Sequence, residues 1–87
     1  MFFYVYILLC QKNNSLYVGF TTDLRQRLQY HNGGKTKTTR ERGPIKLLYA
    51  ESYINEHDAR VREIFLKSGR GREVIKKQLY STLAGIV

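Results

Sequence analysis

Two apolar stretches near the start of the chain, separated by a short polar segment, constrain the fold more than any other feature. Residues 2–10 are rich in Phe, Tyr, Val and Ile, which suit a pleated, buried strand. Lys-Asn-Asn-Ser at residues 12–15 has the chemistry of a turn, and LYVGFT at residues 16–21 returns to strand character. Together these segments predict a β-hairpin, so the fold is built on antiparallel strands.

The next part of the chain predicts one helix and a further strand. Thr22 or Asp23 can cap a helix that runs to about Asn32, where a pair of glycines stops it. A polar, cationic loop is expected over residues 33–44, and IKLLYAESY at residues 45–53 has the composition of a strand. The hairpin is therefore followed by one helix and then by a third strand.

Two more helices are expected after the third strand. Asn55 is a good N-cap, and the acidic residues that follow it complement the helix dipole, so this helix should reach about Lys67. Gly71 is expected to keep the next connection mobile, and residues 72–84 predict a closing helix. We therefore expect one α+β domain over residues 1–87, a small three-stranded antiparallel sheet flanked by three helices in the order β-β-α-β-α-α.

The charge of the chain indicates a polyanionic partner. Lys and Arg number 15 against 7 acidic residues, which gives a formal net charge of +8. A surplus of this size is typical of nucleic-acid-binding proteins, and a merely solvated basic surface is the alternative. The cationic residues expected to contact a phosphate backbone are Lys35, Lys37, Arg40, Arg42, Lys46, Arg70, Arg72, Lys76 and Lys77.

The first apolar stretch also bears on the compartment. Cys10 is the single cysteine, so no intramolecular disulfide can form, in agreement with a reducing compartment. The stretch reaches polar Gln11 too early to span a bilayer, and it has neither a basic flank nor a small-residue cleavage site. We expect a cytoplasmic protein that has no membrane partner.

Strand alternation divides the predicted hairpin into an apolar face and a tyrosine-rich face. With the turn centred between Asn13 and Asn14, even residues of the first strand share a face with odd residues of the second. The apolar face contains Val5, Ile7, Leu9, Leu16, Val18 and Phe20. The other face contains Tyr4, Tyr6, Leu8, Tyr17, Gly19 and Thr21.

Gly19 weakens the strand in which it lies, so its presence needs a physical reason. One reason is the close approach of another backbone, or of a ligand, beside Tyr17. The other is a bulge that bends the strand. Both explanations stay open from the sequence.

The first helix directs an arginine and a histidine towards the sheet. At about 100° per residue, the two leucines of this helix define its buried stripe, with His31 on the stripe and Arg27 at its edge. A partly buried guanidinium needs an anionic partner, either a phosphate or an internal carboxylate such as Glu51 or Glu63. Taken alone, His31 is best explained as a packed or hydrogen-bonded surface histidine.

The helix that follows Asn55 directs a carboxylate inward. Glu63 lies about 40° from Ala59 on a helical wheel, on a helix with apolar residues on two sides. A buried carboxylate is costly unless it is paired or bound to a metal ion. A metal site and a structural ion pair are both consistent with this position, and Arg62 beside it can pair with a neighbour.

These residues together resemble the GIY-YIG nuclease superfamily, specifically its small stand-alone bacterial members. The superfamily also includes the N-terminal domain of the excision-repair incision nuclease and phage homing endonucleases. YVYILLC resembles the GIY strand through Tyr6, and LYVG resembles the YIG segment through Tyr17 and Gly19. Arg27 follows Tyr17 by ten positions, as in the family, and DARVREIFLKSGRG resembles the helix that bears the metal-binding glutamate, here Glu63.

The resemblance covers nearly the whole chain, and it implies a metal-dependent endonuclease that hydrolyses phosphodiester bonds in DNA, in DNA repair or nucleic-acid processing. Glu63 would bind one divalent cation, Mg²⁺ or Mn²⁺, and Tyr17 would act as general base. Arg27 would stabilise the phosphoryl charge, and Tyr6 would orient the water or the phosphate. His31 would assist the leaving group or contact the backbone. DNA is the implied partner, with RNA and a protein partner as further candidates.

The chain departs from the family pattern at several positions. Tyr4 stands where the motif has glycine, and Phe20 stands where the repair enzyme has lysine. Arg40 lies roughly where homing-type members carry a second histidine, and no asparagine follows Asn55. Two other functions therefore stay open. One is a catalytically weakened nucleic-acid-binding domain that acts with a partner protein, and the other is an adaptor whose tyrosine-rich face meets another protein.

Overall fold

The computed structural model describes residues 1–32 and 44–86. Its strands form one antiparallel sheet in the order β2-β1-β3, which confirms the predicted sheet. The strands are β1 (Phe3–Cys10), β2 (Ser15–Thr21) and β3 (Ile45–Tyr53). The helices within the described residues are α1 (Leu24–Asn32), α3 (Glu56–Lys67), α4 (Gly69–Gln78) and α5 (Tyr80–Ala84). The predicted order of strands and helices is also confirmed.

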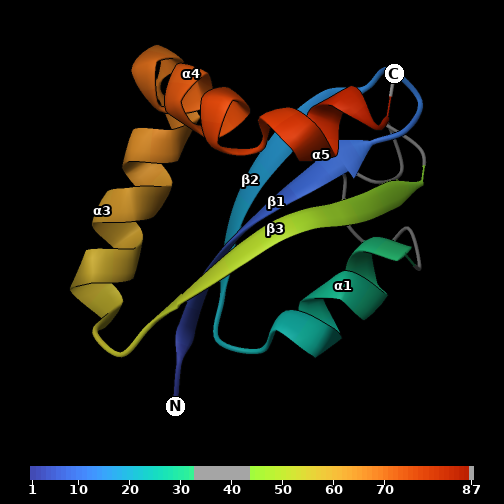
Figure 1. The fold of residues 1–87 in the computed structure, drawn as a ribbon. Helices are drawn as coiled ribbons and strands as arrows, with labels where there is room; N and C mark the ends of the chain where they lie inside the picture. Colours follow the sequence, from blue (N-terminus) through green and yellow to red (C-terminus); the bar gives the residue numbers. More distant parts are fainter. Residues whose placement is uncertain (33–43, 87) are drawn as a thin grey trace.

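The helices cover both faces of the sheet. α1 lies on one side, whereas α3, α4 and α5 lie on the other (Figure 1). The larger core, between the sheet and α3 to α5, is built on Val5, Ile7, Val18, Ala59, Leu66, Ile75 and Leu79. The smaller core, between the sheet and α1, is built on Tyr6, Leu8, Cys10 and Ile45, with Tyr17, Leu24, Leu28 and Leu47 packed against them. None of the described helices is long and apolar enough to cross a membrane.

The pairing of β1 with β2 confirms the predicted faces of the hairpin. Cys10 pairs with Ser15, so the turn is centred between Lys12 and Asn13, one residue before the expected centre. This difference shifts the register by two residues, and such a shift leaves every side chain on its predicted face. The apolar face contributes to the larger core, and the tyrosine-rich face contributes to the smaller one.

A bulge in β3 changes which of its residues face α3. Ile7 pairs with Tyr49 and Leu8 pairs with Leu47, so Leu48 is the extra residue on β3. Leu48 and Tyr49 consequently both pack against the larger core. Beyond the bulge, the odd-numbered residues of β3 share the face of Ile7, and this places Glu51 beneath the helices.

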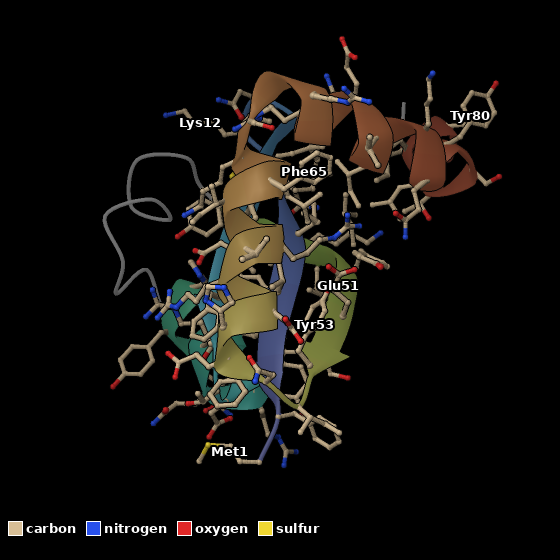
Figure 2. The ribbon with its side chains drawn as sticks, turned by 90° about the vertical axis from the view of Figure 1, so that its left-hand side faces the viewer. Met1, Lys12, Glu51, Tyr53, Phe65 and Tyr80 are labelled. Atoms are coloured by element: carbon tan, nitrogen blue, oxygen red, sulfur yellow. The ribbon has the colours of Figure 1, made fainter. Side chains whose placement is uncertain are left out.

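A hydrogen-bond network around Glu51 joins β3 to two helices. Tyr49 Oη donates to Glu51 Oε2 at 2.7 Å, and Tyr53 Oη donates to Oε1 at 2.9 Å. Arg62 Nε of α3 also donates to Oε1, at 2.7 Å, and Gln78 Nε2 of α4 donates to Tyr49 Oη at 3.0 Å. Figure 2 shows Glu51 and Tyr53 side by side on β3, next to α3. Glu51 and Arg62 are therefore paired with each other.

The connection between α3 and α4 differs from the prediction. Ser68 ends α3 and also caps α4, because its side chain accepts a hydrogen bond from Gly71 N at 3.1 Å. Gly71 is a buried residue of α4 and not a mobile connection, so that prediction was wrong. A Cβ at Gly71 would overlap the backbone of Phe65, and close contact between the two helices therefore requires glycine. The predicted closing helix is also divided, at Leu79, into α4 and α5.

Candidate active site

The candidate site begins where Tyr6 of β1 lies against Gly19 of β2. Tyr6 is fully buried and pairs directly with Gly19. The pairing continues through Gly19 without a shift, so the bulge, one of the two explanations left open by the sequence, is absent from this described pair of strands. The atoms nearest to a Cβ built on Gly19 are those at the hydroxyl end of the Tyr6 ring, which such a Cβ would overlap. Gly19 thus allows the Tyr6 phenol to extend across the edge strand β2.

α1 brings His31 against both tyrosines of the motif. His31 is 2% exposed, and its Nε2 lies 3.2 Å from Tyr6 Oη. The His31 ring centroid lies 5.5 Å from that of Tyr17 and 6.1 Å from that of Tyr6, with edge-on geometry in both pairs. The histidine is therefore packed and hydrogen-bonded, but in the core and not at the surface.

Arg27 of α1 completes a group that we call the tyrosine cluster: Tyr6, Tyr17, Arg27 and His31. Hydrogen bonding to the Tyr6 hydroxyl is the main cause of the raised pKa of Arg27, and Tyr17 contributes in the same direction. The internal carboxylates considered from the sequence, Glu51 and Glu63, pair with other cations. Arg27 Nε is buried without a hydrogen-bond partner in the described part of the chain. A buried donor of this kind can bind an anion.

Burial and charge determine the protonation of the cluster. Burial raises the pKa of Tyr6; the Arg27 hydrogen bond opposes this effect, and the charges of Tyr17 and Glu63 add to it. Burial, followed by the charge of Arg27, lowers the pKa of His31. At neutral pH, Tyr6 is therefore a neutral phenol and His31 a neutral imidazole, while Arg27 contributes a full positive charge.

Glu63 acts on the cluster from the other helical layer. It lies on α3, and its side chain is 12% exposed. Its Oε1 accepts a hydrogen bond from Arg60 Nη1 at 3.2 Å, and its Oε2 accepts one from Lys67 Nζ at 3.0 Å. Although α3 and α1 cover opposite faces of the sheet, the carboxylate charge of Glu63 adds a small contribution to the raised pKa of Tyr6, which burial mainly causes. The structure thus brings four predicted residues into contact and couples the fifth to them electrostatically.

Our sequence analysis did not single out the two cations beside Glu63. Arg60 and Lys67 lie three residues before and four residues after it, which are the spacings at which helical side chains meet. Arg60 also places its Cζ 3.6 Å from the centroid of the Phe20 ring. The ion pairs could have been predicted from this spacing, whereas the contact with Phe20 depends on how α3 lies across β2.

Comparison with known proteins settles the family. A profile of the GIY-YIG catalytic domain matches residues 2–78. The chain belongs to the GIY-YIG family. This is a nuclease family, and the match extends from β1 through α4.

Relatives of this GIY-YIG chain are small bacterial proteins. A UPF0213 protein of Clostridium perfringens is 49% identical over 65 residues, which cover 74% of this chain and 69% of the relative. A UPF0213 protein of Pediococcus acidilactici is 44% identical over 77 residues, covering 85% and 78%. The solution NMR structure of a UPF0213 protein from Bacillus halodurans matches with a TM-score of 0.58 at 38% identity, over 90% of this chain and 85% of that one. These relatives confirm the predicted group of stand-alone GIY-YIG proteins.

The cations expected to bind nucleic acid fall into two sets. Those that the structure describes are all exposed: Lys46 on β3, and Arg70, Arg72, Lys76 and Lys77 on α4. The remaining ones, Lys35, Lys37, Arg40 and Arg42, lie outside the described residues.

GIY-YIG nucleases generally use a divalent metal ion, and Glu63 is the residue to which the family resemblance assigns it. Mg²⁺ binds through one or two carboxylates and retains water and phosphate oxygens as its other ligands. No group of three or more His, Cys, Asp or Glu side chains that could hold a metal ion gathers within residues 1–32 and 44–86. The nearly buried Glu63 fits such a site, because the half-exposed cations on its oxygens can exchange for a metal ion.

Proposed function

We propose that the protein is a metal-dependent endonuclease that hydrolyses phosphodiester bonds in DNA, in DNA repair or nucleic-acid processing. One observation carries the proposal: Arg27 interacts with the hydroxyls of Tyr6 and Tyr17, which both pack against His31, and its buried Nε lacks a partner among the residues described. A phosphoryl oxygen would supply the missing acceptor, because the guanidinium fork matches phosphate geometry. Membership of a nuclease family supports the same chemistry.

Tyr17 is the proposed general base for the attacking water. Arg27 interacts with the Tyr17 hydroxyl, so a positive charge lies beside the oxygen that would accept the proton. Tyr6 is less suited to be the base, because burial raises its pKa. As a neutral phenol hydrogen-bonded to His31 and Arg27, Tyr6 instead orients the water or the phosphate through these neighbours.

The other residues of the site have complementary proposed roles. Arg27 stabilises the negative charge that grows on the phosphoryl oxygens. His31 holds the Tyr6 hydroxyl; as a neutral imidazole that is 2% exposed, it is suited to positioning Tyr6 and not to giving a proton to the leaving oxygen. Glu63 holds the divalent cation, Mg²⁺ or Mn²⁺, which supplies Lewis-acid polarisation of the phosphate when bound.

Exposed cations on α4 are proposed to contact phosphates away from the scissile bond. Arg70 and Lys77 line a hollow of about 570 Å³ together with Glu73 and Val74. α4 begins directly after Ser68, so its first cations follow Lys67 closely along the chain. Contacts of this kind give affinity without sequence choice, and the affinity falls steeply with added salt.

The test is incubation with duplex, nicked, branched and single-stranded DNA, and with RNA, in Mg²⁺, in Mn²⁺ and in chelator. Cleavage is expected with metal and not with chelator, and the RNA substrates decide between the two nucleic acids.

Tyr17→Phe should reduce the rate by about 10²- to 10⁴-fold, as for loss of a general base. Glu63→Gln should abolish metal-dependent cleavage. Arg25→Gln, which changes an exposed arginine of α1, should cleave like the wild type. Cleavage that survives both site substitutions contradicts the assignment.

A catalytically weakened nucleic-acid-binding domain that acts with a partner protein is the second candidate. The pairing of both Glu63 oxygens with Arg60 and Lys67 favours it, because a metal ion has to compete with these cations. Salt-sensitive binding that is indifferent to Mg²⁺, without product, would support this function. The adaptor function has less support, because Tyr6 of the tyrosine-rich face is fully buried.

A further inference from the structure

The Glu63 carboxylate is nearly buried, yet the two cations paired with it reach it from solvent. The side chain of Glu63 is 12% exposed, whereas those of Arg60 and Lys67 are 50% and 53% exposed. A nearly buried carboxylate is costly to leave without a partner, whereas half-exposed Arg and Lys side chains are easily rehydrated. The cations can therefore leave at low cost, provided that another cation replaces them on Glu63.

Arg60 has two other contacts that do not depend on Glu63: its Nε lies 3.9 Å from Oε2 of the exposed Glu56, and its guanidinium lies over the Phe20 ring. Its Cζ lies 3.6 Å from the centroid of the Phe20 ring, which is cation–π geometry. Stacking uses the flat face of the guanidinium and leaves its in-plane N–H groups available for hydrogen bonds. Phe20 lies on β2, the strand that also carries Tyr17 and Gly19. If Glu63 took another partner, Phe20 would keep the Arg60 guanidinium over β2.

We propose that Arg60 is a phosphate-binding residue that Glu63 holds until a divalent cation replaces it there. This inference rests on the proposed nuclease function. In the metal-free protein Arg60 neutralises Glu63. When Glu63 takes Mg²⁺ or Mn²⁺, the released guanidinium remains stacked on Phe20 and pairs with a phosphate of the nucleic acid. One side chain thereby couples metal binding to substrate binding.

The proposal gives Arg60 two effects of opposite sign. Because Arg60 competes for Glu63, its removal should strengthen metal binding. Because the released Arg60 contacts a phosphate, its removal should weaken nucleic-acid binding, but only when metal is present. A purely structural ion pair would not make the nucleic-acid effect depend on metal.

The first experiment is calorimetric titration of Mn²⁺ into the wild type, Arg60→Gln and Arg25→Gln, without nucleic acid. Arg25→Gln is the matched control, because it removes the same charge from an exposed position on α1. Loss of a competing, partly exposed pair should tighten Mn²⁺ binding by about 1.4- to 5-fold beyond the control. Glu63→Gln should abolish Mn²⁺ binding and so identify the site that is being titrated.

The second experiment measures DNA binding by fluorescence anisotropy over a salt series, with Mn²⁺ or with chelator. The probe is a short fluorescein-labelled duplex, and all proteins carry Tyr17→Phe to prevent cleavage. With Mn²⁺, Arg60→Gln should reduce the slope of log affinity against log salt by about 0.9, the value for one phosphate contact. With chelator, the slope should not change.

Phe20→Leu should leave Mn²⁺ affinity near that of the wild type but weaken DNA binding in Mn²⁺, because the Arg60 guanidinium loses the ring on which it stacks.

The proposal is overturned if Arg60→Gln binds Mn²⁺ no more tightly than Arg25→Gln. It is also overturned if the salt slope falls equally with Mn²⁺ and with chelator. Cleavage by the wild type, assayed in the same buffers, separates this proposal from the function on which it rests. If the wild type cleaves and Arg60→Gln behaves like Arg25→Gln, only the role of Arg60 fails. If the wild type binds Mn²⁺ and DNA without cleaving, the nuclease function fails and the binding data still decide the role of Arg60.

Discussion

At Gly19, the absence of a side chain allows Tyr6 to be both buried and hydrogen-bonded to His31. The two strands pair directly here, and the hydroxyl end of the Tyr6 ring fills the space that a Cβ would take. Any larger residue would displace the ring from His31. The position of one phenol in the site thus depends on the residue that faces it across the strand pair.

Gly19→Ala should therefore destabilise the fold by about 1–3 kcal/mol, the usual cost of inserting a methyl group into a packed core. Urea unfolding measures this change. Gly69→Ala is the control, because a Cβ there meets no atom within 4 Å. That substitution should be neutral or should stabilise α4 by up to about 1 kcal/mol. Equal stability of the two variants would contradict the packing argument.

His31 should make stability fall in mild acid. Its pKa is lowered in the folded protein, by burial first and by Arg27 second, whereas an unfolded histidine has a pKa of about 6.5. Between these two pKa values the unfolded state binds more protons, so stability decreases as the pH falls from above 6.5 through the lowered pKa. Thermal unfolding of the wild type over this interval should show the loss.

His31→Gln is the matching variant for this pH dependence. It should be less stable than the wild type at neutral pH, by about 0.5–1.5 kcal/mol for the altered hydrogen bond to Tyr6. Its melting temperature should then vary less with pH in mild acid, because the variant lacks the His31 imidazole, whose pKa differs between the folded and unfolded states. A pH dependence identical to that of the wild type would show that His31 is not the titrating group.

The sequence could predict part of this site residue by residue. Helix periodicity directed Arg27 and His31 to the sheet, and strand alternation placed Tyr6 and Tyr17 on one face. Alternation gives the face of a side chain but not its χ1 direction, so the ring of Tyr6 across Gly19 could not be predicted.

Among the elements, the corner between α3 and α4 is held by one serine. Ser68 Oγ donates to Phe65 O at 2.6 Å and accepts from Gly71 N at 3.1 Å. It thereby satisfies a carbonyl at the end of one helix and an amide at the start of the next. The two helices meet without a loop, and the cations of α4 are held at a defined position relative to Glu63.

Ser68→Ala should remove this double cap and destabilise the protein by about 0.5–2 kcal/mol. Urea unfolding is the measurement, and Ser81→Ala is the control, because Ser81 is an exposed serine within α5. The control should be neutral or slightly stabilising, since alanine favours helix. If both variants unfold at the same urea concentration, the serine cap does not hold the corner.

Strands and helices could be predicted where the apolar pattern is periodic. The prediction failed at a glycine, which can serve either flexibility or close packing. The prediction of which side chains share a face of the hairpin was robust, because a two-residue change in register leaves every side chain on the same face. Gly71 was taken to indicate a mobile connection, but it allows α4 to approach Phe65 closely. A sequence alone does not distinguish a glycine used for flexibility from one used for close packing.

For the molecule as a whole, the layers are joined by the hydrogen-bond network around Glu51. This carboxylate of β3 accepts hydrogen bonds from Tyr53 and from Arg62 of α3. Burial, together with the hydrogen bond to Glu51, raises the pKa of Tyr53 to about 12. The network therefore depends on a phenol that has to remain protonated.

Alkaline pH should weaken this link between the layers. An unfolded tyrosine has a pKa of about 10, so the contribution of Tyr53 is complete below that pH and is lost as the pH rises towards about 12. Thermal unfolding over this interval should show a smaller loss for Tyr53→Phe than for the wild type. Tyr80→Phe, at a residue that is 74% exposed, should follow the wild type. An unchanged alkaline profile in Tyr53→Phe would exclude Tyr53 as its source.

The position of β1 in the middle of the sheet has a consequence for biosynthesis. β1 leaves the ribosome before both of its partner strands, and the hairpin with β2 closes only one of its two edges. Its other edge stays open until residues 45–53 have been translated, and the last six residues of the strand are all buried in the finished sheet. Open apolar edges promote association between nascent chains. Timely arrival of β3 is thus what protects the growing chain from aggregation.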